Sequence, residues 1–222
     1  MILDLGKMDY VESLTVQRKL NQLRNEGRID DCMIVVDHPG VYTAGIHWVS
    51  GPETDGLDVI RVERGGSITY HGPGQLITYY VVNLKERNIN VLNLINGIQE
   101  CSIELLDTWN IGAHPRLGKE TGIWAGERKI ASIGLAVKGF STLHGCALNV
   151  STDLSNFNRI HPCDFNPEVM TSMEKILGKP VDLEKIKEQY ADIAQEKLGM
   201  GEIIKNKGYL EDLNELLSET VL

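Results

Sequence analysis

A chain of 222 residues with 42% hydrophobic residues is long enough for one domain with a substantial core. Its net charge of -9 argues against a nucleic-acid-binding protein, which needs a basic face. Acidic residues among the first twelve positions argue against a secretory signal, and no apolar run reaches the about 18 residues of a membrane span. We therefore expect a cytoplasmic protein that binds neither nucleic acid nor a membrane.

The first half of the chain is expected to form a run of strands between two helices. Val16, Leu20 and Leu23 recur at helical spacing, and the apolar run CMIVVD is typical of a buried strand. In chain order the patterns predict a helix over 8–24, strands over 32–37, 59–63 and 75–84, and a helix over 91–109.

The second half begins with strands and ends with helices. The patterns predict a hairpin of strands 122–125 and 129–137, a strand over 142–151, and helices over 168–177, 182–198 and 208–219. Because most strands follow one another directly, we expect an α+β fold with a mixed, mostly antiparallel sheet flanked by helices. We expect one domain over residues 1–222, with a helical C-terminal part from about 168.

A glycine-rich segment between two predicted strands, from Arg64 to Gln75, is the first candidate site. Glycines allow the backbone to approach a ligand closely, and a hairpin turn usually needs only two to five residues. The segment is therefore more typical of a substrate-binding loop than of a turn, and it includes Arg64, Gly65, Gly66, Ser67, Ile68, Thr69, Tyr70 and His71.

Two further segments carry polar groups on predicted strands. Lys129 opens an apolar strand and, from its residue type alone, is expected to be a solvated strand-end lysine. Gly145 lies inside a strand, which indicates close approach by a ligand or another backbone. His144 beside it is more typical of a hydrogen-bonded structural histidine than of a base.

The four cysteines differ in their surroundings. Cys32, Cys101 and Cys146 lie in apolar segments and are expected to be buried and inert. Cys163 lies in a non-periodic segment after a proline, so it is the candidate nucleophile, provided that a nearby cation lowers its pKa. The absence of closely spaced Cys and His pairs predicts that there is no metal site.

Taken together, five ordered motifs resemble those of one family, the lipoyl(octanoyl) transferases, over roughly residues 30–165. The motifs are His38-Pro39-Gly40-Val41-Tyr42-Thr43-Ala44-Gly45, the Arg64 to Gln75 loop, Lys129 to Gly134, His144-Gly145 with Ala147 to Val150, and Phe157 to Cys163.

The resemblance implies a fold like the catalytic domains of biotin and lipoate protein ligases, and an acyltransferase without cofactor or metal. It implies that Cys163 carries the acyl group as a thioester and that Lys129 lowers the pKa of that cysteine and shuttles protons. The acyl chain would be bound by the residues from Arg64 to His71 named above, by Ser132, Ile133 and Gly134, and by Gly145, Cys146 and Ala147. Cys146, His161 and Asp164 depart from the residues usual in the family.

The resemblance also implies the partners of the reaction. The donor would be octanoyl-acyl carrier protein, and the acceptors would be lipoyl domains of 2-oxoacid dehydrogenase E2 subunits and the glycine cleavage H protein. Because acyl carrier proteins are acidic, we expect a local basic patch of Arg64, Arg159 and Lys138. Backbone N–H groups near Gly145 or Gly74 would hold the oxyanion. We expect a monomer.

Three alternatives remain open from the sequence. An ATP-dependent lipoate ligase on the same fold would form an acyl-adenylate and need no cysteine. An octanoyl amidotransferase would use a similar thioester but take the acyl group from another lipoyl-domain protein. A non-catalytic acyl-binding protein would form no adduct at Cys163.

Overall fold

The computed structural model describes residues 1–49, 51, 54, 56–162 and 165–204. The strands are β1 (Ile2–Lys7), β2 (Cys32–Asp37), β3 (Val41–Ala44), β4 (Val59–Arg61), β5 (Ile68–His71), β6 (Gln75–Val81), β7 (His114–Arg116), β8 (Gly122–Ala125), β9 (Arg128–Lys138), β10 (Ser141–Asn149) and β11 (Ile203–Ile204). The α-helices are α1 (Tyr10–Asn25), α2 (Val91–Thr108), α3 (Met173–Leu177) and α4 (Leu183–Leu198).

The described strands form two sheets. The large sheet has eight strands in the order β11-β1-β2-β6-β10-β9-β8-β7, and the small sheet has three in the order β4-β3-β5. In the large sheet β1 is parallel to β11 and β2, and the remaining neighbours are antiparallel. The expected α+β class, with a mixed and mostly antiparallel sheet, is confirmed.

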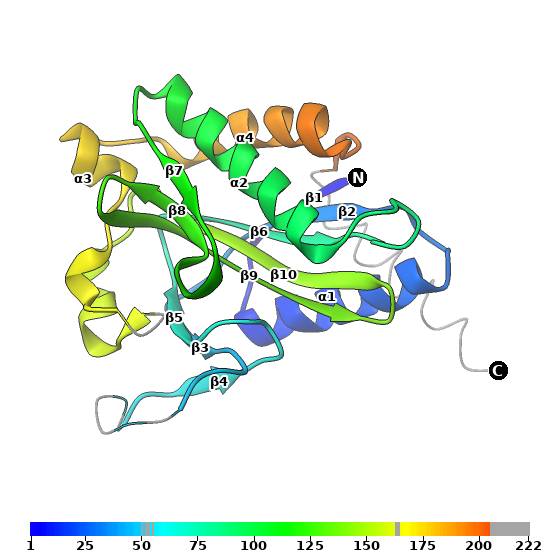
Figure 1. Cartoon of the computed structure of the whole chain (residues 1–222), viewed down its shortest axis with the longest axis horizontal. Coiled ribbons are helices and arrows are strands. Elements are labelled where there is room, and N and C mark those ends of the chain that lie inside the picture. Colours follow the sequence, from blue (N-terminus) through cyan, green and yellow to red (C-terminus); the bar gives the residue numbers. More distant parts are fainter. Residues whose placement is uncertain (50, 52–53, 55, 163–164, 205–222) are drawn as a thin grey trace.

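Helices cover both faces of the large sheet (Figure 1). On one face, α2 and α4 pack side chains such as Ile98, Leu105 and Tyr190 onto the sheet in the larger apolar cluster. On the other face, Leu14, Leu20 and Leu23 of α1 form a second cluster with β1, β2 and β6. The small sheet lies beside α1, and its outer side packs against residues 154–160 and 169–170 in a third cluster. The core is therefore divided by the large sheet.

Most predicted elements are present, with differences at a few places. The sequence did not predict strands β1, β3, β5, β7 and β11, and the predicted helix over 168–177 is wrong in its first half. There, Met170 forms a bridge with Lys129, and the Ser172 side chain caps α3 by accepting from the Lys175 backbone N–H, so the helix begins at Met173. The predicted helix over 208–219 lies outside the described residues.

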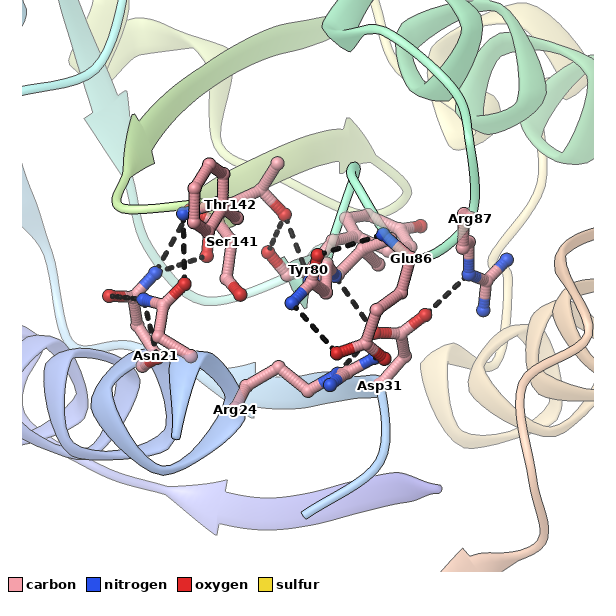
Figure 2. A network of polar contacts seen from close by, with 12 residues as sticks. Asn21, Arg24, Asp31, Tyr80, Glu86, Arg87, Ser141 and Thr142 are labelled. Carbon is pink, nitrogen blue, oxygen red and sulfur yellow. Dashed lines mark hydrogen bonds and ion pairs between the residues drawn. The ribbon is translucent and has the colours of Figure 1, made fainter. Parts of the chain in front are cut away.

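A partly buried polar network joins α1 to the start of β2 and the segment after β6 (Figure 2). Asp31 accepts hydrogen bonds from Arg24 Nε at 2.7 Å, from Arg87 Nε and from the Asn83 backbone N–H at 2.8 Å. Burial raises the pKa of Asp31, but the Asn83 N–H and the two arginines outweigh it, and the pKa lies below its ordinary value. Arg87 also donates to the Leu198 carbonyl at 2.6 Å, so the network fixes the end of α4.

Among the described residues, no helix has both the length and the apolar character needed to cross a membrane.

Candidate active site

A cavity of about 450 Å³ lies between the glycine-rich loop, α1 and the large sheet. That volume includes space at the mouth of the cavity that is open to solvent. Eleven of the fourteen predicted acyl-binding residues line it: Arg64, Gly65, Gly66, Thr69, His71, Ser132, Ile133, Gly134, Gly145, Cys146 and Ala147. Tyr10, Tyr79 and His144 also line it, although the sequence did not mark them as binding residues.

Alternation along β5 explains why the other three predicted residues do not line the cavity. Thr69 and His71 point into it, whereas Ile68 and Tyr70 point to the opposite side and pack with Phe157 in the third apolar cluster. Ser67 is buried in the loop, where its carbonyl accepts from Gly45 N–H at 3.0 Å and Arg64 at 2.9 Å.

Arg64 organises the loop that covers the cavity. Its guanidinium donates to the carbonyls of Gly65, Ser67 and Thr43 at 2.8 to 3.1 Å, and its side chain is buried. The backbone N–H of Gly65 donates to the Leu135 carbonyl at 3.0 Å, which fixes the loop to β9. Since Arg64 is buried and bound to backbone oxygens, its expected part in an exposed basic patch is wrong.

The other two residues of the expected patch are exposed and lie on different elements. The Arg159 guanidinium carbon is 5.9 Å from the centre of the Tyr42 ring, beside the small sheet. Lys138 ends β9, where its carbonyl accepts from Asn21 of α1 at 3.3 Å.

Neutral aromatic and histidine side chains surround one part of the cavity. His38 Nδ1 donates to the Met8 carbonyl at 2.8 Å, so its Nε2 accepts from the Tyr79 hydroxyl at 2.9 Å. The His71 ring stacks on the Tyr10 ring at 6.0 Å, and burial, followed by the nearby Arg64 cation, holds the pKa of His71 well below its ordinary value. Burial also raises the pKa of Tyr10 to about 12, so both groups are uncharged at neutral pH.

His144 has an unusual backbone for the middle of a strand. Its φ of 62° lies in the left-handed region, which is strained for a residue with a side chain. Its backbone N–H donates to Gln17 Oε1 of α1 at 3.0 Å instead of joining the ladder with β6. Thr142 compensates, because its hydroxyl donates to the Tyr80 carbonyl at 2.7 Å and accepts from the Val82 N–H at 3.1 Å.

Gly145 follows His144 on β10, which lies between β6 and β9 in the sheet. It pairs with Tyr79 on β6 and with Gly134 on β9. A Cβ atom here would lie 2.0 Å from the Thr78 carbonyl oxygen, so no larger residue fits. The close approach that the sequence indicated at Gly145 is therefore made by the backbone of β6.

Cys146 contacts the cavity but belongs to the apolar side of the sheet. It packs in the α2–α4 cluster, and a hydrogen bond with Ser102 of α2 is the main effect that lowers its pKa. Burial outweighs that bond and raises the pKa of Cys146 to about 12. The thiol therefore stays protonated. The expected burial of Cys32, Cys101 and Cys146 is confirmed.

Lys129 is not a solvated lysine, because only 1% of it is exposed. Its Nζ has no hydrogen-bond partner among the described residues, and it lies 5.8 Å from the centres of the Trp124 and Phe165 rings. A Cβ atom on Gly122 of β8 would lie 2.8 Å from Lys129 Cε, so glycine there leaves room for the lysine. The Lys129 carbonyl accepts from the Thr171 N–H at 3.0 Å, which fixes the start of β9.

Cys163 and Asp164 lie outside the described residues, but their neighbours are described. Pro162 is buried, and the ring of Phe165 contacts both Trp124 and Lys129. His161 is exposed. Phe165, two residues after Cys163 in the sequence, thus lies beside Lys129.

The sequence of the chain matches a known family of catalytic domains. The family model of the lipoyl protein ligase A/B catalytic domain matches residues 9–194, so the chain belongs to that family. A relative from Picrophilus torridus, named probable octanoyltransferase 2, is 49% identical over 201 residues, which cover 90% of this chain and 80% of the relative. An octanoyltransferase from Desulforamulus reducens is 39% identical over 83% of this chain and 85% of its own length.

Solved structures confirm the fold at lower sequence identity. A lipoate-protein ligase A bound with ATP superposes with a TM-score of 0.72 at 17% identity, covering 99% of this chain and 94% of the ligase. The biotin protein ligase from Aquifex aeolicus gives a TM-score of 0.51 at 14% identity, covering 89% and 68%. The expected likeness to biotin and lipoate protein ligases is therefore confirmed.

Proposed function

We propose that the chain transfers an octanoyl group from acyl carrier protein to a lysine of a lipoyl domain, with Cys163 as thioester carrier and Lys129 as its partner. The names of its relatives support octanoyl transfer, and the cavity supports the binding of a medium-length acyl chain. The acceptors would be lipoyl domains of 2-oxoacid dehydrogenase E2 subunits and the glycine cleavage H protein.

The observation that carries the proposal is the environment of Lys129. Burying an amine without a hydrogen-bond partner costs free energy. A buried amine of this kind, such as Lys129 Nζ, is therefore a candidate for binding a charged partner or for taking part in a reaction. The contact with Phe165, two residues after Cys163 in the sequence, supports the cysteine as that partner. A neighbouring ammonium group favours the thiolate form of a cysteine, which is the nucleophilic form.

The proposed reaction has two acyl transfers. The Cys163 sulfur attacks the carbonyl carbon of the donor thioester, the bond to the carrier sulfur breaks, and the thiol proton passes through Lys129 to the carrier thiolate. The acceptor lysine nitrogen then attacks the acyl carbon of the Cys163 thioester, the bond to the Cys163 sulfur breaks, and an amide forms. The proton that the amine loses returns through Lys129 to the Cys163 sulfur. Since the donor is already activated, neither ATP nor a metal takes part.

Intact mass of the protein after incubation with octanoyl-acyl carrier protein, without ATP, tests the thioester. We expect an octanoyl adduct on the wild-type protein and on Cys146→Ser, and none on Cys163→Ser. An adduct that needs ATP would favour the ligase, and no adduct at all would favour an acyl-binding protein. A parallel incubation with an octanoylated lipoyl domain as donor distinguishes the proposed enzyme from an amidotransferase. An amidotransferase would form the adduct faster with this donor than with octanoyl-acyl carrier protein.

A second test concerns Lys129. Replacing it by methionine, which has a similar shape, should slow adduct formation by about a thousandfold, since general acid–base groups contribute roughly 10²–10⁴. Lys138→Met changes the exposed lysine at the other end of β9 and should leave the rate within twofold. Equal rates for Lys129→Met and the wild type would exclude Lys129 from the proton transfers.

We further propose that residues 1–222 form a single catalytic domain that acts as a monomer in the cytoplasm, without a cofactor. Sedimentation of the purified chain tests the oligomeric state. Activity of the protein after dialysis against a chelator tests the absence of a metal.

A further inference from the structure

The end of the cavity that lies farther along β9 from Lys129 is polar, although the proposed ligand is a hydrocarbon chain. His144 pairs with Leu135 across the β9–β10 ladder. Leu135 is six residues after Lys129 and three after Ser132, which corresponds to about 20 Å and about 10 Å along a strand. An acyl chain that begins beside Ser132 and follows β9 would therefore end near His144.

The length of an octanoyl chain agrees with this spacing. An extended residue contains three backbone bonds, so the seven carbon–carbon bonds of the octanoyl chain span a little more than two residues. That length is roughly 9 Å. Two additional methylenes would extend it by roughly 2.5 Å. A decanoyl chain would thus meet the His144 side chain where an octanoyl chain stops.

The left-handed backbone at residue 144 separates the histidine from the regular alternation of β10 and brings its ring beside Tyr79, at 6.5 Å between centres. The side chain is 1% exposed, and neither ring nitrogen has a hydrogen-bond partner among the described residues. A carboxylate oxygen of Glu63 lies 3.6 Å from Nε2, beyond normal hydrogen-bonding distance, and Arg18 holds that carboxylate with two bonds of 3.1 and 3.2 Å.

His71 repeats the pattern on the facing sheet. It lines the same cavity, it is buried, and its Nδ1 also has no partner among the described residues. Burial lowers the pKa of His144 to about 4 and that of His71 well below its ordinary value, so both rings are neutral near pH 7. Two neutral rings with unsatisfied nitrogens form a wall that favours water over a methyl group.

We propose that His144 is a specificity-determining residue that ends the acyl site, and that its unpaired Nδ1, with that of His71, disfavours chains longer than octanoyl. A longer chain must displace the ring and remove water from these nitrogens, and it offers no hydrogen bond in return. The inference rests on the proposed octanoyl transfer and adds to it the residue that limits the length of the chain.

The test replaces His144 by residues that tolerate its left-handed backbone. Glycine removes both the ring and its polarity, whereas asparagine is smaller than histidine but keeps hydrogen-bonding groups. Each protein receives an equimolar mixture of octanoyl- and decanoyl-acyl carrier protein, and intact mass gives the ratio of the two adducts. His114→Asn, at an exposed histidine of β7, is the matched control, and thermal unfolding shows that each variant is folded.

We expect His144→Gly to raise the decanoyl-to-octanoyl ratio about tenfold, because two buried methylenes then contribute their full transfer energy. His144→Asn should raise it by threefold or less, and His114→Asn should not change it. An unchanged ratio in folded His144→Gly would overturn the inference while leaving octanoyl transfer intact. Equal increases in the glycine and asparagine variants would overturn the role of the nitrogens. Absence of any octanoyl adduct on the wild-type protein would instead contradict the proposed function.

Discussion

The two faces of the large sheet are built from different chemistry. The face covered by α2 and α4 is packed with aliphatic and aromatic side chains, and Leu105, Ile98 and Ala194 there are fully buried. The face covered by α1 buries a stripe of polar residues at helical spacing, formed by Ser13, Gln17, Asn21 and Arg24. The α2–α4 layer stabilises the sheet mainly through buried apolar area. The α1 layer has its own apolar cluster and adds hydrogen bonds from the polar stripe to particular groups.

The partners of the polar stripe show what it does. Ser13 contacts His38, Gln17 accepts from the His144 N–H, Asn21 donates to the Ser141 and Thr142 carbonyls, and Arg24 binds Asp31. The first two partners, the His38 ring and the His144 N–H, belong to residues beside the cavity. Because these bonds are directional, the α1 face can hold a strained backbone that an apolar face could not specify. The cavity therefore lies on the face covered by α1, where hydrogen bonds fix its wall.

The apolar face should account for stability without affecting the chemistry. Leu105→Ala on α2 should lower the free energy of unfolding by about 4 kcal/mol, since it leaves a cavity in the larger cluster. Leu92→Ala on the same helix changes a residue that is 46% exposed and should cost less than about 0.5 kcal/mol. Urea unfolding measures both, and a folded Leu105→Ala protein with much slower octanoyl transfer would show that the two faces are not separate in function.

The polar face should respond to acid, through the network in Figure 2. Asp31→Asn removes the charge that Arg24 and Arg87 share and should cost about 2 to 3 kcal/mol at pH 7. Because the pKa of Asp31 is lowered in the folded protein, its contribution is complete above the ordinary value of 3.8 and is lost as the pH falls through the folded value.

The difference in stability between the wild type and Asp31→Asn should therefore shrink below about pH 4. Asp30→Asn, at the exposed neighbouring carboxylate, should be neutral at every pH and serves as control. A difference that is constant from pH 7 to pH 3 would mean that the charge of Asp31 contributes nothing.

The contrast between the faces also explains which parts of the fold could be predicted from the sequence. Hydrophobic spacing located α2, α4, β2 and the β8–β9 hairpin, since each of these is recognised by the apolar side chains that it buries. It could not locate β5, because this strand lies inside the glycine-rich segment. Its side chains also point alternately into the cavity and into the small third cluster, so they form no apolar pattern. The motifs marked the cavity because the lining residues come from segments with unusual glycines.

The polar stripe of α1 and the backbone of His144 were beyond such reasoning. Gln17 and His144 are 127 positions apart in the sequence. The burial of Gln17 and the backbone conformation of His144 are explained by the hydrogen bond between them. The spacing of Ser13, Gln17, Asn21 and Arg24 by four, four and three places them on one face with Leu20, which is the one signal in the sequence that could have indicated their burial. Lys129 was expected to be solvated from its residue type, and the family motif alone indicated a different role.

The smallest effect, on Gln17, tests the comparison most sharply. Gln17→Met keeps the volume of the side chain but removes the acceptor of the His144 N–H, and should cost about 1 to 2 kcal/mol in the free energy of unfolding. If the hydrogen bond fixes the left-handed backbone, the variant should also transfer octanoyl groups severalfold more slowly. A substitution on the α2 face that lowers the free energy of unfolding by the same amount should slow the transfer much less. Gln22→Met, at an exposed position of the same helix, should change neither quantity. Full transfer activity in a destabilised Gln17→Met protein would mean that the stripe supports the fold but not the wall of the cavity.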